Sequence, residues 1–297
     1  MLRAAALLVT SLLVSGCHPG NTEAKRLRAS CEAGDVAACN QFAGRLQRGD
    51  YVLQDLARAA ALYDQACRGG IAEGCARFGG MLERGDGVKQ DSTRALELYR
   101  QGCERGSMEG CSRLGVRYRD GRGVTRDIAR AASLFQQSCA GGDLTGCAHI
   151  GSLYALGDGV PQDFARAAEL LKKSCDAGIP IACVGLGRLH TTGSGVPKSE
   201  FTGAALFKQT CTYVEKAGCF DLAKVYESGQ GMPQDFGEAA DLYREACEDR
   251  NGEACARLAG LYEKGAGVNR DTASATRLKK RACDAGQTDL CVKPKAQ

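Results

Sequence analysis

The sequence predicts an all-α fold, a solenoid of about seven stacked helix pairs, on the basis of three observations. Cysteines recur as pairs, with seven residues between the partners and 36 residues between the starts of successive pairs. Apolar residues follow a helical spacing after the second cysteine of each pair, and a Gly-x-Gly turn closes that segment in most copies. A fixed period of this length is typical of repeat proteins, in which each unit buries its apolar face against its neighbours.

The first 16 residues have the layout of a signal peptide. One cation, Arg3, precedes an apolar run over residues 4–14, which is too short to span a bilayer as a helix. The run ends in Val-Ser-Gly-Cys17, which resembles the signal of bacterial lipoproteins, where the cysteine is lipidated and becomes the first mature residue. We therefore expect a lipoprotein-type signal peptide at 1–16 and, over residues 17–30, an anchor at Cys17 followed by a short lead-in helix.

The residue after Cys17 bears on which membrane holds the chain. It is His18, whereas aspartate would indicate retention in the inner membrane of some bacteria. The resemblance therefore implies lipid anchoring in the cell envelope at the outer membrane, facing the periplasm or the cell surface. No later segment is long and apolar enough to cross a bilayer. A net charge of +4 is too small to indicate nucleic acid as a partner.

The other sixteen cysteines form eight pairs in the 36-residue register. An exported chain in an oxidising compartment uses paired cysteines as disulfides. Zinc sites need clusters of cysteine and histidine, whereas the chain has three histidines in all, so we expect no metal and no cofactor. The expected pairs are Cys31 with Cys39, Cys67 with Cys75, Cys103 with Cys111, Cys139 with Cys147, Cys175 with Cys183, Cys211 with Cys219, Cys247 with Cys255, and Cys283 with Cys291.

Each pair is predicted to join the end of one helix to the start of the next. On a straight helix, positions eight apart lie roughly 12 Å from each other, beyond the roughly 7 Å Cα limit of a disulfide, so the chain must turn. Pairing Cys39 with Cys67 across a helical hairpin is the alternative, and it would leave Cys31 and Cys291 single. We favour the short turn, where six copies carry a glycine: Gly34, Gly70, Gly106, Gly142, Gly178 and Gly286.

Each repeat is predicted to contain two helices, A and B. Helix A follows the second cysteine, as in Cys111-Ser-Arg-Leu-Gly-Val-Arg-Tyr118, and ends in the Gly-x-Gly turn. That turn lacks the Lys-Ser/Thr of a phosphate-binding loop. Helix B follows one column of residues that can cap its first turn, and alanines then permit close helix packing. The cap column comprises Asp55, Asp91, Asp127, Asp163, Ser199, Asp235 and Asp271.

These features resemble the Sel-1-like repeat, a 36-residue relative of the tetratricopeptide repeat. The resemblance covers residues 31–291, and a cysteine pair in every copy places the chain near the cysteine-rich bacterial branch of that family. It implies a right-handed αα-superhelix over residues 31–292, followed by a tail at 293–297. It also implies a scaffold or adaptor role in the cell envelope, and some members of this branch are named penicillin-binding proteins or β-lactamases.

In such solenoids the A helices line the concave surface. Positions two, five and nine residues after the second cysteine share one side of helix A, called the groove face below. Cations outnumber acids there, which suits an acidic protein or peptide, or an anionic peptidoglycan fragment. A solvated helix face without a ligand is the simpler alternative. The candidate binding residues are Arg77, Arg84, Arg113, His149, Arg188, Lys224, Arg257 and Lys264.

The sequence thus favours a non-catalytic binding scaffold. The alternative, a β-lactam-binding protein or β-lactamase-type hydrolase, rests on family resemblance. The chain carries no Ser-x-x-Lys, Ser-Asp-Asn or Lys-Thr-Gly motif. His190 replaces a recurring tyrosine and is interpreted as a packed histidine, and His149 lies on the groove face; no catalytic residue is assigned.

Overall fold

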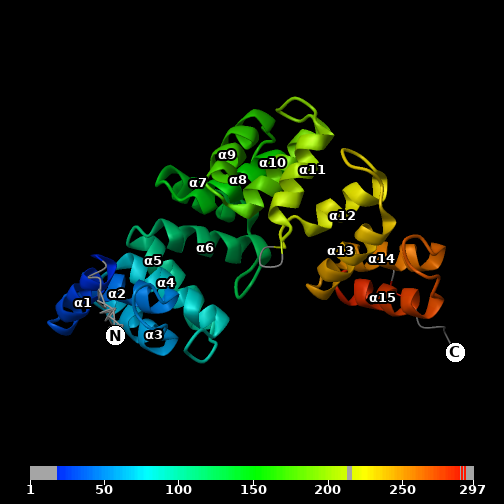
Figure 1. Cartoon of the computed structure of the whole chain (residues 1–297). Coiled ribbons are helices and arrows are strands. Elements are labelled where there is room, and N and C mark those ends of the chain that lie inside the picture. The colour runs from blue at the N-terminus through cyan, green and yellow to red at the C-terminus, as the bar shows by residue number, and fades with distance from the viewer. Residues whose placement is uncertain (1–18, 213–215, 288, 290, 292–297) are drawn as a thin grey trace, which may run out of the picture. The chain divides into compact units, whose positions relative to one another are not determined.

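The computed structural model describes residues 19–212, 216–287, 289 and 291, and its regular elements there are all α-helices (Figure 1). The expected signal peptide, Cys17 and the tail lie outside the described residues. A leading helix precedes seven helix pairs, as predicted: α1 (Pro19–Glu32); α2 (Val36–Arg48) and α3 (Leu56–Arg68); α4 (Ala72–Arg84) and α5 (Ser92–Glu104); α6 (Met108–Asp120) and α7 (Ile128–Ala140); α8 (Leu144–Leu156) and α9 (Phe164–Asp176); α10 (Pro180–Thr192) and α11 (Glu200–Thr210); α12 (Cys219–Ser228) and α13 (Phe236–Glu248); α14 (Gly252–Lys264) and α15 (Thr272–Asp284).

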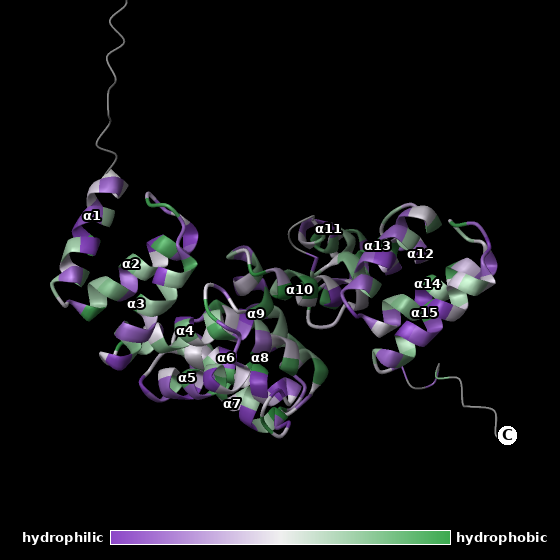
Figure 2. Ribbon diagram, turned by 90° about the horizontal axis from the view of Figure 1, so that it is seen from below, coloured by the Kyte–Doolittle hydropathy of each residue, from purple (hydrophilic) through white to green (hydrophobic). Residues whose placement is uncertain are grey.

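The chain divides into two compact units, with the boundary between residues 110 and 111, inside α6. In the second unit, the A helix α8 packs against its B helix α9 and also against the next A helix, α10. Buried clusters follow one another from α8 to α15, and Val184 and Leu186 of α10 belong to successive clusters. Hydrophobic and hydrophilic residues alternate around the helices (Figure 2). The core of the second unit is therefore a run of linked helix-pair interfaces, as expected of an αα-solenoid.

The described helices show no candidate for crossing a membrane: none combines the necessary length and apolar character.

The predicted cap column begins every B helix. In each of the seven copies, a side-chain oxygen of the cap residue accepts a hydrogen bond from a backbone N–H of the first turn. Asp91 Oδ1, for example, accepts from the N–H of Arg94 at 2.9 Å. These bonds satisfy donors that a helix start otherwise leaves without an intrahelical partner.

The disulfides close the short turns between B helices and the next A helices. Seven pairs join cysteines eight positions apart, with Cα–Cα distances of 4.5–5.0 Å: Cys31 with Cys39, Cys67 with Cys75, Cys139 with Cys147, Cys175 with Cys183, Cys211 with Cys219, Cys247 with Cys255, and Cys283 with Cys291. Cys103 and Cys111 are disulfide-bonded as well. Pairing across the short turn is therefore confirmed.

The backbone of these turns follows the prediction. The six turn glycines have φ between 83° and 102°, in the left-handed region that glycine adopts without strain. In the turn between Cys247 and Cys255, which has no glycine at this position, Arg250 takes the same region at φ 65°.

The second glycine of the A–B loop is a contact point between repeats in five copies: Gly87, Gly159, Gly195, Gly231 and Gly267. A Cβ on Gly159 would lie 2.5 Å from Cγ2 of Ile128, which opens the preceding B helix. A Cβ on Gly267 would lie 2.1 Å from the carbonyl carbon of Phe236 in the same way. The glycine is therefore required because the loop rests directly on the start of the neighbouring helix.

The first loop lacks this glycine and carries Tyr51, with φ 60°. The helix beneath it is α1, which presents Gly20, and a Cβ there would lie 2.4 Å from Cε2 of Tyr51. The first copy thus keeps the contact with the small residue on the helix and the large residue on the loop.

The turn between Cys211 and Cys219 departs from the other copies, as its unusual sequence suggests. α11 has 11 residues and α12 has 10, whereas the other repeat helices have 13. The disulfide keeps the same span, with a Cα–Cα distance of 4.6 Å. The disulfide therefore keeps its span although α11 and α12 are shorter than the other repeat helices.

Candidate binding groove

The groove-face residues divide between the two units. Arg77 and Arg84 belong to the first unit, and the other six candidates, from Arg113 to Lys264, belong to the second. Three candidates of the second unit, Arg188, Lys224 and Arg257, line one hollow.

In the first unit, both cations have local partners. Arg77 is half-buried, its guanidinium carbon lies 5.9 Å from the centroid of the Tyr63 ring, and its Nε lies 3.7 Å from Glu109. Arg84 pairs with Asp86 of the adjoining loop at 2.6 Å. Both charges are therefore neutralised nearby.

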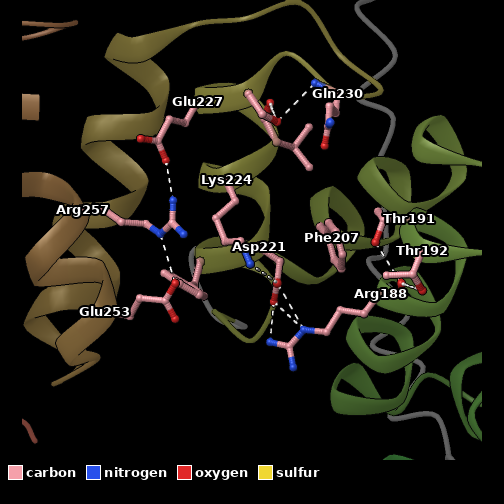
Figure 3. Close-up of a pocket in the computed structure, with 13 residues that line it drawn as sticks. Arg188, Thr191, Thr192, Phe207, Asp221, Lys224, Glu227, Gln230, Glu253 and Arg257 are labelled. Atoms are coloured by element: carbon pink, nitrogen blue, oxygen red, sulfur yellow. Dashed lines mark hydrogen bonds and ion pairs between the residues drawn. The ribbon is translucent and has the colours of Figure 1, made fainter. Parts of the chain in front are cut away.

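The hollow in the second unit has a volume of about 750 Å³ and lies along α10, α12 and α14 (Figure 3). Phe207, Phe220 and Val225 contribute apolar surface, and Thr191, Thr192, Ser228 and Gln230 contribute hydroxyl and amide groups. Three cations and three acids complete the lining: Arg188, Lys224, Arg257, Asp221, Glu227 and Glu253. We call this site the α10–α14 hollow.

Asp221 organises one side of the hollow. Arg188 donates from Nη2 to Asp221 Oδ2 at 2.7 Å and from Nε to both carboxylate oxygens at 3.2 Å. The Asp221 side chain is 5% exposed and the Arg188 side chain 60%. Lys224 Nζ lies 4.0 Å from Asp221 and 5.4 Å from the centroid of the Phe220 ring. The acid is thus buried beneath two cations whose outer surfaces face solvent.

Arg257 organises the other side. Its Nη1 donates to Glu227 at 3.0 Å and its Nε to Glu253 at 3.1 Å (Figure 3). The hydroxyl of Tyr243, on the B helix α13, donates to Glu227 Oε2 at 2.6 Å. Burial, together with this hydrogen bond to an anion, raises the pKa of Tyr243. This side is a closed network of paired charges.

His149 does not lie on an open groove, which corrects its predicted place. It is 9% exposed, and its ring centroid lies 4.7 Å from that of Phe135 on α7. Arg119 Nη1 lies 3.3 Å from His149 Nδ1, and because arginine only donates, Nδ1 accepts and Nε2 carries the proton. Burial, and next the Arg119 charge, lower the pKa of His149 from 6.5 to about 4.

The remaining candidates are placed outside the hollow. Arg113 is half-buried, and Lys264 is exposed in the last turn of α14. His190 is half-buried, and its Nδ1 lies 3.2 Å from the carbonyl oxygen of Pro197. Within the described ranges, no group of three or more His, Cys, Asp or Glu side chains could hold a metal ion.

Sequence reasoning missed the residues that give the hollow its shape and charge balance. Phe207 belongs to a B helix, and Glu253 stands two residues before a cysteine, outside the positions assigned to the groove face. Glu253 lies four residues before Arg257, and Glu227 lies 30 before it. A search for acids one turn away, or in the last turn of the preceding A helix, would have found both.

Comparison with known proteins agrees with the geometry of the repeats. The Sel1 repeat matches in seven segments, residues 36–71, 72–107, 109–143, 145–179, 180–212, 216–251 and 252–287. No curated protein sequence matches the chain significantly.

Solved structures of repeat proteins are similar to the chain. One is c5321, described as a protective antigen of uropathogenic Escherichia coli with an SLR fold: identity is 26%, TM-score 0.54, and the match covers 90% of this chain and 57% of that one. This chain thus spans little more than half of that protein. A Sel1 repeat protein from Oxalobacter formigenes shares 23% identity with TM-score 0.56, over 90% of this chain and 77% of that one. The chain therefore belongs to the Sel1 repeat family, whose members are typically scaffolds for protein–protein interaction.

Proposed function

We propose that the protein is a non-catalytic scaffold or adaptor of the bacterial cell envelope that holds a protein or peptide in the α10–α14 hollow. The observation that carries this proposal is the convergence of three predicted groove-face residues, Arg188, Lys224 and Arg257, on one hollow of about 750 Å³. A volume of this order accommodates a few side chains of a peptide.

The lining indicates what kind of peptide fits. Its three cations and three acids balance, so the net charge of the hollow favours neither acidic nor basic peptides. The acids, however, are committed: Asp221 to Arg188, and Glu227 and Glu253 to Arg257. Lys224 is 42% exposed and lies 4.0 Å from its nearest acid, beyond hydrogen-bond distance. An incoming carboxylate can therefore bind Lys224 and the outer edge of Arg188.

The apolar surface supports a peptide over a polar cell-wall fragment. The buried Phe207 and Val225 and the half-buried Phe220 give the hollow an apolar base. An apolar ligand side chain packed there would add burial to the ion pair at the rim. We infer a segment in which an acidic residue adjoins an apolar or aromatic one.

The cell envelope is proposed from the cysteines. Eight cysteine pairs in disulfide form suit an oxidising, exported environment. The signal-like start with Cys17 supports lipid anchoring, and His18 supports the outer membrane, with the repeats facing the periplasm or cell surface. The described contacts join neither His149 nor His190 to a hydroxyl nucleophile, and we advance no hydrolase activity.

Selection of peptides on the disulfide-intact protein tests the site. Random peptides displayed on phage are enriched on immobilised protein, and the binding of synthetic copies is measured by fluorescence anisotropy. We expect enriched peptides to combine acidic and apolar residues. Lys224→Gln should weaken them about tenfold, the loss expected for one charge-assisted hydrogen bond.

Lys172→Gln on α9 is the matched control, because it removes the same charge outside the hollow. Its peptide affinities should equal those of the unmodified protein. Enriched peptides without acidic residues would overturn the acidic preference. Peptides that Lys224→Gln and Phe220→Ala leave unaffected would overturn the site itself.

A further inference from the structure

The loop between α2 and α3 gathers exposed apolar side chains. Among described residues of the first unit, the exposed large hydrophobic residues are Tyr51, at 50%, and Leu53, at 92%. The position of Leu53 is occupied in the other loops by Lys89, Thr125, Pro161, Pro197, Pro233 and Asn269. Single exposed apolar residues are ordinary, but two within three residues of one loop form an exposed apolar pair.

This loop lies at the end of the unit where the described chain begins. Tyr51 packs on Gly20, as a Cβ at Gly20 would lie 2.4 Å from the tyrosine ring. Gly20 is three residues after Cys17 in the sequence. In the sequence, only His18 and Pro19 separate Cys17 from Gly20.

Cations flank the same loop. Leu53 lines a second hollow, of about 870 Å³, together with Lys25 and Arg28 of α1 and Arg58 of α3. Arg28 and Arg58 share Glu32, at 2.8 Å and 3.5 Å, and Asp55 caps α3. Three cations against two acids leave a net charge of +1, with Lys25 exposed on α1.

We propose that Tyr51 and Leu53, flanked by Lys25 and Arg28, dock on the surface of an anionic phospholipid bilayer. This inference rests on the lipid anchor at Cys17 proposed above. Leucine and tyrosine side chains insert at the boundary between headgroups and acyl chains, where tyrosine is favoured. Lysine and arginine beside them attract anionic headgroups.

Docking of this loop would give the protein a second contact with the membrane, in addition to the lipid anchor. A lipid at one end of a chain tethers a protein without orienting it, whereas an inserted loop beside the tether fixes which face meets the membrane. The first unit would then stand on the bilayer by its α1 end, with the loop as the contact point.

A tryptophan reporter tests insertion, because the chain contains no tryptophan of its own. Leu53→Trp is placed in the mature chain with Cys17→Ser and an N-terminal histidine tag, bound to vesicles of phosphatidylethanolamine, phosphatidylglycerol and a nickel-chelating lipid. This tether replaces the acyl group, so the reading does not depend on lipidation. The control is Phe201→Trp in the second unit, where the native side chain is 74% exposed.

We expect the Leu53→Trp emission to shift to the blue and to lose most of its intensity when acyl chains carry bromine. The Phe201→Trp emission should stay unchanged. Adding Tyr51→Ser, or Lys25→Glu with Arg28→Glu, should reduce the Leu53→Trp quenching. Equal quenching of both reporters, or of neither, overturns the docking alone. An intact mass of envelope-extracted protein showing no lipid on Cys17 overturns the anchor and, with it, this inference.

Discussion

Gly20 of α1 contacts Tyr51 of the first A–B loop, with the small residue on the helix and the large residue on the loop. Later repeats have the reverse arrangement at this contact, with glycine on the loop. A Cβ on Gly20 would lie 2.4 Å from Cε2 of Tyr51, whereas in the fourth pair a Cβ on the loop residue Gly159 would lie 2.5 Å from Cγ2 of Ile128 on the helix. In both places one partner must be glycine because the loop sits on the start of the preceding helix. In the first copy the glycine is on the helix, at Gly20, rather than on the loop.

This contact predicts a compensating pair of substitutions. Gly20→Ala should loosen the start of α1, because the new methyl group overlaps the Tyr51 ring. Tyr51→Gly should relieve that overlap, so the double variant should lose less stability than the sum of the two single variants. Hydrogen exchange of α1 amides and urea unfolding measure both effects. Additive losses would show that the two residues do not meet.

Gly260→Ala is the control for glycine replacement itself. No atom lies within 4 Å of the position of a Cβ at Gly260 in α14. The substitution should leave stability unchanged or raise it by up to about 1 kcal/mol, because alanine favours helix.

Two classes of left-handed glycine should differ in their tolerance of alanine. Gly142 has φ 91° and no atom within 4 Å of an added Cβ, so Gly142→Ala should cost about 1 kcal/mol of backbone strain. A Cβ on Gly267, at φ 68°, would lie 2.1 Å from Phe236, so Gly267→Ala should cost roughly 1–3 kcal/mol more. Urea unfolding of the two variants gives the comparison, and equal losses would contradict the contact between repeats.

Each disulfide should contribute measurably to stability. Replacing Cys139 and Cys147 together by alanine opens a link between residues eight positions apart and should cost about 2.5 kcal/mol in the chain-entropy account. Chemical unfolding of the double variant measures this loss. A change below about 0.5 kcal/mol, within the usual range for surface substitutions, would contradict it.

His149 should make the second unit sensitive to acid. Burial, with Arg119 beside it, holds the pKa of His149 at about 4, against 6.5 ordinarily. Between these values the unfolded chain binds the proton and the folded chain does not, so stability falls as pH drops from 6.5 to 4. The full loss is about 3 kcal/mol.

Urea unfolding at a series of pH values measures this slope. His149→Gln should flatten it, because glutamine does not titrate and can still accept from Arg119. His190→Gln is the matched control and should keep the slope that His149 produces. An unchanged slope in His149→Gln would assign the acid sensitivity to other groups.

Tyr243 should stabilise the last two helix pairs through its hydrogen bond to Glu227. Tyr243 is fully buried and donates at 2.6 Å, so Tyr243→Phe should cost about 1.5–3 kcal/mol, the range for hydrogen bonds to charged groups. The variant keeps the ring and therefore the packing. A loss below about 0.5 kcal/mol in urea unfolding would mean that Arg257 alone satisfies Glu227.

The repeat architecture could be predicted because its determinants are local. The cap at Asp91, the turn at Gly142 and the pairing of Cys139 with Cys147 each depend on residues within eight positions of one another. Their 36-residue period made each feature visible several times in the sequence. Caps, turns and disulfides followed from this short-range chemistry.

The hollow could be predicted only in part, because it depends on contacts between repeats. Arg188 was assigned to the groove face, but its ion pair with Asp221 spans 33 positions and forms only when α10 lies beside α12. His149 was assigned by the same rule, yet Phe135 of a B helix covers it. Position on a helix face does not determine which neighbour shields a side chain.

The short sequence separation of the disulfide partners has an evolutionary consequence. Because each bond links cysteines only eight residues apart, gain or loss of one 36-residue period leaves no orphan thiol behind. Such a lineage can lengthen or shorten its array by unequal recombination without creating a reactive sulfur.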